Sequence, residues 1–342
     1  MKTLHIALAA ASLACLSARA PFQELVFAVE EGAVVSKSFS SSGSFNLEDA
    51  QVMFNGEEAP LDQIGMEDGI DVEFEVEMGC TDTYETMGEV DGEPRPTVLL
   101  RAFDAARRAY EDQDGDGEDE ELSLVGTTVR YAWDEGLGAY DTSFVGDEEG
   151  DEEDLEGLRE DMDLRSLLPE GEVDEGDSWT PSGSAVLELL IPGFDVDEAL
   201  GGDDDELPAP VRERIQQMFE DLTLECTLAG EVEEDGVTLQ RIDLVATLED
   251  TIAVDPEWIM DEEEEAENPE MTWDHFDAEL EFGLEGSVLW NAAEGRFQSY
   301  DCDLEGTVVV DAALALEAFG LEIEATLEFS MRTEANGSAT DG

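Results

Sequence analysis

Apolar and polar residues alternate one by one along several long stretches of the chain. In residues 70–78 an Ile, two Val, a Phe and a Met alternate with four acidic residues, and residues 321–331 alternate in the same way. A period of two places apolar side chains on one face of a strand and polar side chains on the other. These stretches therefore predict antiparallel strands with one buried and one solvated face.

Weaker alternation runs through much of the C-terminal part. It predicts a β-meander of about five long strands over residues 222–332, joined by short turns such as 233–236 and 292–295. The acidic run at 261–267 and two others, at 147–154 and 203–206, are predicted to be solvated loops.

Three segments show helical spacing instead. In 97–111, Leu99, Phe103, Ala106 and Tyr110 recur at intervals of four, three and four residues, just after Pro96. A second helix is predicted over 208–221, where two prolines begin the segment, and a third over 151–168. With no regular strand–helix–strand rhythm, the expected class is α+β, dominated by long, curved antiparallel sheet with a few packing helices.

The chain divides into four expected parts. Residues 1–20 form a leader, and residues 336–342 are predicted to be a disordered tail. Between them, residues 21–178 form a β-rich lobe that carries the helix at 97–111. Residues 179–335 form a second lobe with the helix at 208–221 and the meander.

The leader has one early base, Lys2, followed by an apolar run from 6 to 16. Such a segment is too short for a permanent transmembrane helix and is typical of a secretory signal peptide. Cys15 ends the run "SLAC", which is similar to a lipoprotein box although Ser12 departs from its pattern, so Cys15 is a candidate for lipidation. The protein is expected to be exported to the periplasm or beyond, either cleaved or lipid-anchored, with no later transmembrane segment.

Acid dominates the charge. The 342 residues include 91 Asp and Glu against 15 Lys and Arg, a formal net charge of −76. Such a surface repels the phosphates of nucleic acids and attracts cations. The protein is therefore not expected to bind nucleic acid, and cations are expected as counterions.

Four of the few bases, Arg95, Arg101, Arg107 and Arg108, fall within 14 residues. They could form an anion site, or they could pair with the surrounding carboxylates. Pairing is the favoured interpretation because acid is so abundant.

Asp112, Asp114 and Asp116, followed by Gly117, match the start of an EF-hand calcium loop. The twelfth position is Ser123 rather than Glu, and a strand-like run follows where the second helix should begin. This excludes an EF-hand but leaves a weak calcium site on the three aspartates as a hypothesis, and no other cofactor is expected.

Three cysteines follow the leader. Cys226 and Cys302 lie in strand-like runs and could form a disulfide across a sheet, which would leave Cys80 as a free thiol. The alternative is that all three are small, buried apolar residues.

Catalytic patterns are missing from the sequence. His275 is the only histidine after the leader, no Gly-x-Ser-x-Gly or glycine-rich phosphate loop occurs, and the Cys and His set is poor material for zinc. The chain is therefore not expected to be an enzyme.

Leu168-Pro169, Val173 and Gly176-Asp177-Ser178-Trp179 form a pattern "LP…V…GDSW". In this pattern the chain resembles a family of secreted or lipid-anchored bacterial envelope proteins to which no activity is assigned. The resemblance implies export and a structural role for these residues.

Together these features favour an exported, highly acidic, non-enzymatic envelope protein with a binding or structural role. Two alternatives stay open: a half-barrel carrier of an apolar or lipid ligand, by analogy with curved sheets crossed by a helix, and a weak divalent-cation binder. The ligand and any protein partner are not defined by the sequence.

Overall fold

The structure is a computed structural model. It covers residues 25–61, 69–90, 92–113, 115, 117–146, 150, 152–183, 185–194, 214, 217–219, 222–253, 271–316 and 321–342.

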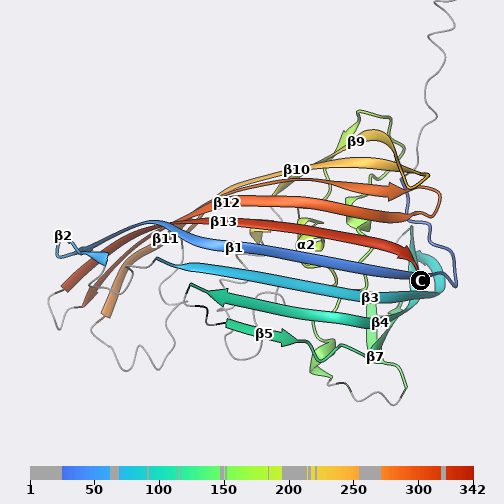
Figure 1. Ribbon diagram of the computed structural model, residues 1–342, viewed down its shortest axis with the longest axis horizontal. Coiled ribbons are helices and arrows are strands. Elements are labelled where there is room, and N and C mark those ends of the chain that lie inside the picture. The colour runs from blue at the N-terminus through green and yellow to red at the C-terminus, as the bar shows by residue number, and fades with distance from the viewer. Residues whose placement is uncertain are drawn as a thin grey trace, which may run out of the picture.

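A single open antiparallel sheet of 13 strands makes up most of the molecule (Figure 1). Its order is β7-β6-β4-β3-β1-β13-β12-β11-β10-β9-β8, with β2 beside β1 and β5 beside β4. The strands are β1 (Val34–Phe54), β2 (Glu57–Glu58), β3 (Asp71–Val90), β4 (Glu93–Asp112), β5 (Gly117–Glu121), β6 (Thr128–Asp134), β7 (Ala139–Phe144), β8 (Ser178–Trp179), β9 (Thr223–Glu234), β10 (Val237–Ala253), β11 (Met271–Asn291), β12 (Arg296–Leu316) and β13 (Leu321–Asp341).

The two ends of the chain meet in the middle of the sheet, where β1 pairs with β13 from Val35↔Asp341 to Phe54↔Ile323. The regions expected to form separate lobes, 21–178 and 179–335, thus contribute to one continuous sheet. The tail 336–342 was predicted to be disordered, and this is wrong, because β13 extends to Asp341 and is paired there on both sides.

The five strands expected between 222 and 332 are present as β9 to β13, paired in chain order. The turn at 233–236 joins β9 to β10 with positive φ at Asp235 (50°) and Gly236 (83°), as a tight hairpin requires. The turn at 292–295 joins β11 to β12. The loop expected at 261–270 lies outside the described residues.

The predicted helix over 97–111 is wrong, because this segment belongs to β4. Leu99, Phe103, Ala106 and Tyr110 do share one face, but a β-bulge between Phe103 and Ala105 shifts the alternation by one residue. Because of this one-residue shift, the four residues recur at intervals of four, three and four, which are the intervals expected for one face of a helix.

Helices are short throughout the described residues. The segment 151–168 contains only two 3-10 turns, Glu153–Leu155 (η2) and Arg165–Leu167 (η3), rather than a helix. Of the helix expected over 208–221, residue 214 and residues 217–219 are helical and the others lie outside the described residues. The six-residue α2 (Ala185–Leu190) was not foreseen. The fold is therefore mostly β, and the long antiparallel sheet of the expected α+β class is confirmed while its packing helices are not.

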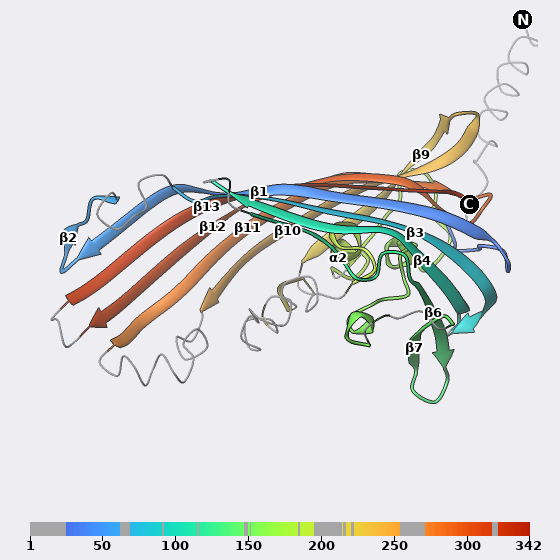
Figure 2. The ribbon, with the colours of Figure 1, turned by 60° about the horizontal axis from the view of Figure 1, so that its bottom comes forward.

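The sheet has two chemically different faces. We call "inner" the face that carries the core side chains and "outer" the opposite, acid-rich face. Figure 2 shows the sheet as an arch, with α2 and its neighbours beneath one half of the inner face. We call residues 152–183 and 185–194 the covering segment. Its buried residues, such as Met162, Leu167 and Leu189, pack in the same cluster as Phe39 and Cys302 of the sheet.

β1 and β3 approach each other closely at Gly43. The ring of Phe74 lies over Gly43, where a Cβ atom would come within 2.6 Å of the ring and 2.3 Å of the Arg332 carbonyl oxygen. Only glycine leaves room for this aromatic ring beside the backbone.

Candidate functional site

The inner face divides into two halves with different burial. Over the covering segment, side chains such as Cys80, Leu244 and Ala335 are buried to 1% exposure. Further along the same strands, Leu327, Val310 and Leu280 face the same way but are only half-buried. We call this second region the distal inner face.

Cross-strand register arranges the distal inner face in rows. The inner-facing residues of the first row run from β3 to β10, and those of the next two run from β1 to β10. The first row is Val72, Phe45, Met331, Gly306, Phe282 and Leu248; the second is Leu47, Phe329, Val308, Leu280 and Asp250; the third is Ala50, Leu327, Val310, Ala278 and Ile252.

These rows are apolar with one exception among the residues named, Asp250. Phe45 and Phe329 stack at 4.6 Å between ring centroids, which adds rigidity to the surface. Five residues along one face of β13, from Ile323 to Met331, cover roughly 26 Å at about 3.3 Å per residue. The surface is thus large enough for an extended hydrocarbon chain.

Polar groups flank this surface on both sides. On the β10 side, Asp250 pairs with Arg214 at 2.5 Å. On the other side, Arg108, Tyr110 and Asp112 of β4 face inward beside Glu118 and Glu120 of β5. We call these five residues the β4–β5 margin. It holds one base and three acids, and Tyr110 is half exposed, at 50%.

A buried charge cluster fastens the covering segment to the sheet. Lys37 lies 2.8 Å from Asp82 and 2.7 Å from Asp163, and all three side chains are fully buried. Arg101 binds Asp82 through Nε and Nη2, and it also donates to the backbone carbonyls of residues 159 and 160. Although burial opposes ionisation, the charges of Arg101 and Lys37 lower the pKa of Asp82 to about 2. The two positive side chains of this cluster, Lys37 and Arg101, balance the two carboxylates, Asp82 and Asp163. A balanced, buried cluster of this kind suits a structural role.

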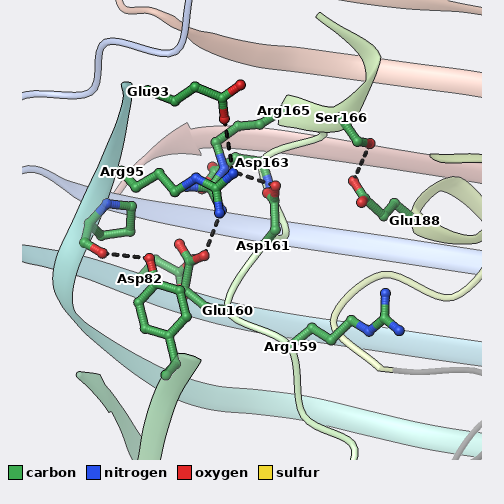
Figure 3. A network of polar contacts seen from close by, with 12 residues as sticks. Asp82, Glu93, Arg95, Arg159, Glu160, Asp161, Asp163, Arg165, Ser166 and Glu188 are labelled. Atoms are coloured by element: carbon green, nitrogen blue, oxygen red, sulfur yellow. Dashed lines mark hydrogen bonds and ion pairs between the residues drawn. The ribbon is translucent and has the colours of Figure 1, made fainter. Parts of the chain in front are cut away.

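A second charged group lies beside it within the covering segment (Figure 3). Arg165 donates to Glu160 at 2.5 Å and to Asp161 at 2.8 Å, while Ser166 donates to Glu188 at 2.7 Å. Burial raises the pKa of Glu160 to about 7 and that of Glu188 to about 8, and the charge of Asp161 acts in the same direction on both. The buried Oε1 of Glu160 has no hydrogen-bond partner among the described residues. The pKa values of both carboxyl groups thus lie well above the usual value of a glutamate.

The Arg-rich strand bears out intramolecular pairing. Arg101 is in the buried cluster, Arg107 pairs with Glu75 and Asp119, and Arg108 pairs with Glu120. Arg95 pairs with Glu93. Pairing, the favoured interpretation of these four residues, is confirmed.

The candidate calcium ligands are only partly described. Asp112 is the last residue of β4, whereas Asp114 and Asp116 lie outside the described residues. Within the described part of the chain, no three His, Cys, Asp or Glu side chains are grouped as a metal site. Calcium binding by the three aspartates stays a prediction.

The proposed disulfide between Cys226 and Cys302 is wrong. Cys226 lies in β9 and Cys302 in β12, with β10 and β11 between them, so about 14 Å separates them where a disulfide needs less than about 7 Å. Cys80, Cys226 and Cys302 are all free and buried, which confirms the alternative. Cys15 lies outside the described residues.

His275 lies on the outer face of β11, where its Nε2 is 2.5 Å from Oδ1 of Asp311. Both side chains are about half exposed, at 43% and 56%. The contact is a surface ion pair when the imidazole is protonated, and it holds the pKa of Asp311 below its usual value.

The "LP…V…GDSW" residues tie the covering segment to the sheet edge. Trp179 donates through Nε1 to the carbonyl of Leu167 at 2.8 Å, and Ser178 and Trp179 form β8 against β9. Val173 is buried. The motif is therefore structural in this chain.

Sequence reasoning missed the buried charge cluster. One signal pointed to it: Lys37 is the only lysine after Lys2, in a chain crowded with exposed acid. A lone lysine in an alternating strand, at an inner-facing position, indicates a specific buried partner.

No protein-family model and no curated protein matches the chain. Among solved structures, the chain is similar to the outer membrane protein OprG from Pseudomonas aeruginosa, with 7% identity over 93% of this chain and 100% of that one, at a TM-score of 0.21. OccK2 (OpdF) from the same organism, in complex with glucuronate, shows 8% identity over 82% of this chain and 64% of that one, at a TM-score of 0.15. These TM-scores are too low to define a shared fold. None of the helices within the described residues has the length and hydropathy to span a bilayer.

Proposed function

We propose that the protein is an exported, non-enzymatic binding protein that holds an apolar ligand, of the kind found in lipid tails, on its distal inner face. The observation that carries the proposal is the set of three mainly apolar rows. Their side chains are half-buried, apart from the buried Leu248 and Phe329, whereas the same face of the sheet is buried further along. A contiguous apolar surface that stays partly accessible to solvent is typical of an interaction site.

The energetics favour an apolar occupant. Each 100 Å² of apolar surface removed from water contributes about 2.5 kcal/mol. Val310 and Leu327 are direct cross-strand neighbours near the centre of the surface, and both are half-buried. A hydrocarbon chain lying over them would remove apolar area from water on both partners.

The proposed export of the protein rests on its leader sequence rather than on its fold. A signal peptide over residues 1–20 would export the chain, and Cys15 would anchor it if lipidated. The formal charge of −76 would keep such a protein soluble and away from nucleic acid. A carrier of apolar molecules needs that solubility.

Native mass spectrometry after exposure to a bacterial lipid extract tests the proposal. Retained lipid is expected for the unmodified protein, and less for V308T/V310T, which makes two inner-facing positions polar without changing their shape. V309T is the matched control, because Val309 points to the outer face between them. Absence of retained lipid, or equal retention by both variants, would overturn the proposal.

Weak calcium binding stays a separate hypothesis for Asp112, Asp114 and Asp116. Calorimetric titration of calcium at physiological salt tests it, and a titration without saturable heat would end it. A purely structural role is the remaining alternative. Retention of lipid in the mass-spectrometry experiment would contradict it.

A further inference from the structure

We infer that the covering segment is a pH-dependent clasp on the inner face of the sheet. It lies closed while Glu160 and Glu188 carry protons, and the part between these two residues detaches from the sheet when both ionise. The clasp operates whether or not the proposed apolar ligand is bound. It follows from the balance of buried acids and bases where the segment meets the sheet.

The buried charges balance only while Glu160 and Glu188 are neutral. The cluster around Lys37 contains two bases and two acids, so it contributes no net charge. Beside it, Arg165 pairs with Asp161 at 2.8 Å and with Glu160 at 2.5 Å (Figure 3). One guanidinium neutralises one carboxylate. Ionised Glu160 and Glu188 would therefore add two buried negative charges in excess.

Two further bases lie near this group and do not remove the excess. Arg95 of β4 already pairs with Glu93, at 2.9 Å. Arg159 is exposed, so water screens its charge, and it acts on Glu188 more weakly than the opposing charge of Asp161 does. The excess acid is thus met by Arg165 alone.

Glu160 cannot solvate a negative charge while the segment is closed. Its side chain is 3% exposed, and its Oε1 atom has no hydrogen-bond partner among the described residues. Tyr140 of β7 is near enough to sense the charge of Glu160, but its hydroxyl donates to the carbonyl of Pro96 at 2.7 Å. A carboxylate oxygen without water or a donor favours the protonated form. Burial accordingly raises the pKa of Glu160 to about 7.

Glu188 of α2 lies on the other side of the same group. It accepts a hydrogen bond from Ser166 at 2.7 Å, which joins α2 to the end of the loop that carries Arg165. Burial and the charge of Asp161 raise its pKa to about 8. Ionisation of both glutamates would set three carboxylates against Arg165, and separating α2 from residues 160–166 would let water reach them. Local opening is therefore the response that relieves the repulsion.

The sign of the pH dependence follows from proton binding. In the open segment both glutamates regain their ordinary pKa of 4.5, so the open form holds fewer protons than the closed form. Raising the pH therefore favours opening. Each group that is ionised only in the open form increases the open fraction about tenfold per pH unit. Both groups contribute up to about pH 7, and Glu188 continues up to about pH 8.

Limited proteolysis with trypsin between pH 6 and pH 8.5 tests the clasp. Trypsin cleaves after arginine, and the side chain of Arg165 is only 10% exposed while the segment is closed. Arg241 is the internal reference, because its side chain is 49% exposed but its strand is paired on both sides. Each rate is divided by the rate of cleavage of a small arginine substrate in the same buffer. Normalised cleavage after Arg165 should rise at least about tenfold from pH 6 to pH 7, while cleavage after Arg241 stays slow.

Matched variants assign the effect to the two glutamates. E160Q/E188Q mimics the protonated side chains and cannot ionise, so its cleavage after Arg165 should stay at the low rate of the unmodified protein at pH 6. Each single variant should keep about half of the logarithmic pH slope below pH 7. E170Q changes an exposed carboxyl of the same segment and should behave as the unmodified protein does.

Three results would overturn the clasp. Cleavage after Arg165 could be independent of pH in the unmodified protein, or E160Q/E188Q could keep the full pH dependence. Equal increases at Arg165 and Arg241 would also overturn it, because they would report unfolding of the whole sheet. Lipid retention does not enter this experiment, so the clasp and the proposed function can fail separately.

Discussion

Nζ of Lys37 lies 2.7 Å from Oδ1 of Asp163, and both side chains are fully shielded from solvent. Lys37 belongs to β1, at the centre of the sheet, and Asp163 belongs to the covering segment. Tyr84 of β3 donates to both oxygens of Asp163, at 2.7 and 2.9 Å. One carboxylate therefore holds the covering segment to two strands.

The first prediction concerns this clamp. Lys37→Met should lower the free energy of unfolding by about 3–5 kcal/mol, because it leaves a buried carboxylate without its cation. Urea unfolding followed by circular dichroism measures the loss. Arg108→Met is the control. Arg108 and Glu120 are each about half exposed, at 53% and 52%, so removing that pair should cost less than about 1 kcal/mol.

A double variant separates two effects of Lys37→Met: the loss of the attraction between Lys37 and Asp163, and the cost of leaving the buried Asp163 carboxylate without a cation. Lys37→Met combined with Asp163→Asn restores electrical balance and keeps an acceptor for Tyr84. It should regain part of the stability that the single variant loses. A double variant no more stable than Lys37→Met would contradict the assignment of Asp163 as the stranded charge.

The second prediction concerns pH. Burial and nearby acid raise the pKa of Glu160 from 4.5 in the unfolded chain to about 7 in the folded protein. Between these values the folded state holds more protons, so stability is full below pH 4.5 and falls as pH rises to 7. The full effect is on the order of 3 kcal/mol. Urea unfolding at intervals between pH 4.5 and 7.5 measures it.

Glu160→Gln should flatten this pH dependence, because the amide cannot ionise yet its oxygen can still accept from Arg165. Glu170→Gln, which changes an exposed carboxyl in the same segment, should leave it unchanged. Glu188, whose pKa is raised to about 8, adds a loss of the same sign up to pH 8. Parallel curves for Glu160→Gln and the unmodified protein would refute the role of Glu160.

β4 shows where sequence reasoning reached its limit. Leu99, Phe103, Ala106 and Tyr110 were correctly placed on one face, but the face belongs to a bulged strand. Two inner positions between them hold Arg101 and Arg108, which hide the apolar alternation. Both residues depend on partners distant in sequence, namely Asp82 and Glu120. No local pattern reveals such pairing.

The long alternating strands were predictable because each carries its own period of two, and the apolar side of the distal inner face follows from that period. The pairing of β1 with β13 was not predictable, because it joins segments that lie far apart in the sequence. Residues 336–341 are small and polar and look like a tail, yet Gly337 is needed where the rings of Tyr300 and Phe39 approach the backbone. Long-range register, rather than composition, orders this segment.

The third prediction concerns the thiols. Burial raises the pKa of Cys80, Cys226 and Cys302 to about 12, so the reactive thiolate is scarce at neutral pH. Native protein treated with iodoacetamide should stay unmodified at all three positions, and urea-unfolded protein should react at all three. Peptide mass mapping distinguishes the sites. Rapid native labelling at one of them would show that its strand opens.

The fourth prediction concerns Trp179, the last residue of the "GDSW" pattern. Trp179→Phe removes the hydrogen bond to the Leu167 carbonyl and leaves that acceptor unpaired, while keeping an aromatic side chain against the core. A lost hydrogen bond of this kind should lower the free energy of unfolding by about 1–2 kcal/mol. Ser178→Ala is the companion variant, since its hydroxyl lies 2.7 Å from that of Thr227 in an exposed contact and should matter less. Urea midpoints compared at equal m-values measure both changes. If Trp179→Phe is as stable as the unmodified protein, the motif does not fasten the covering segment through this bond.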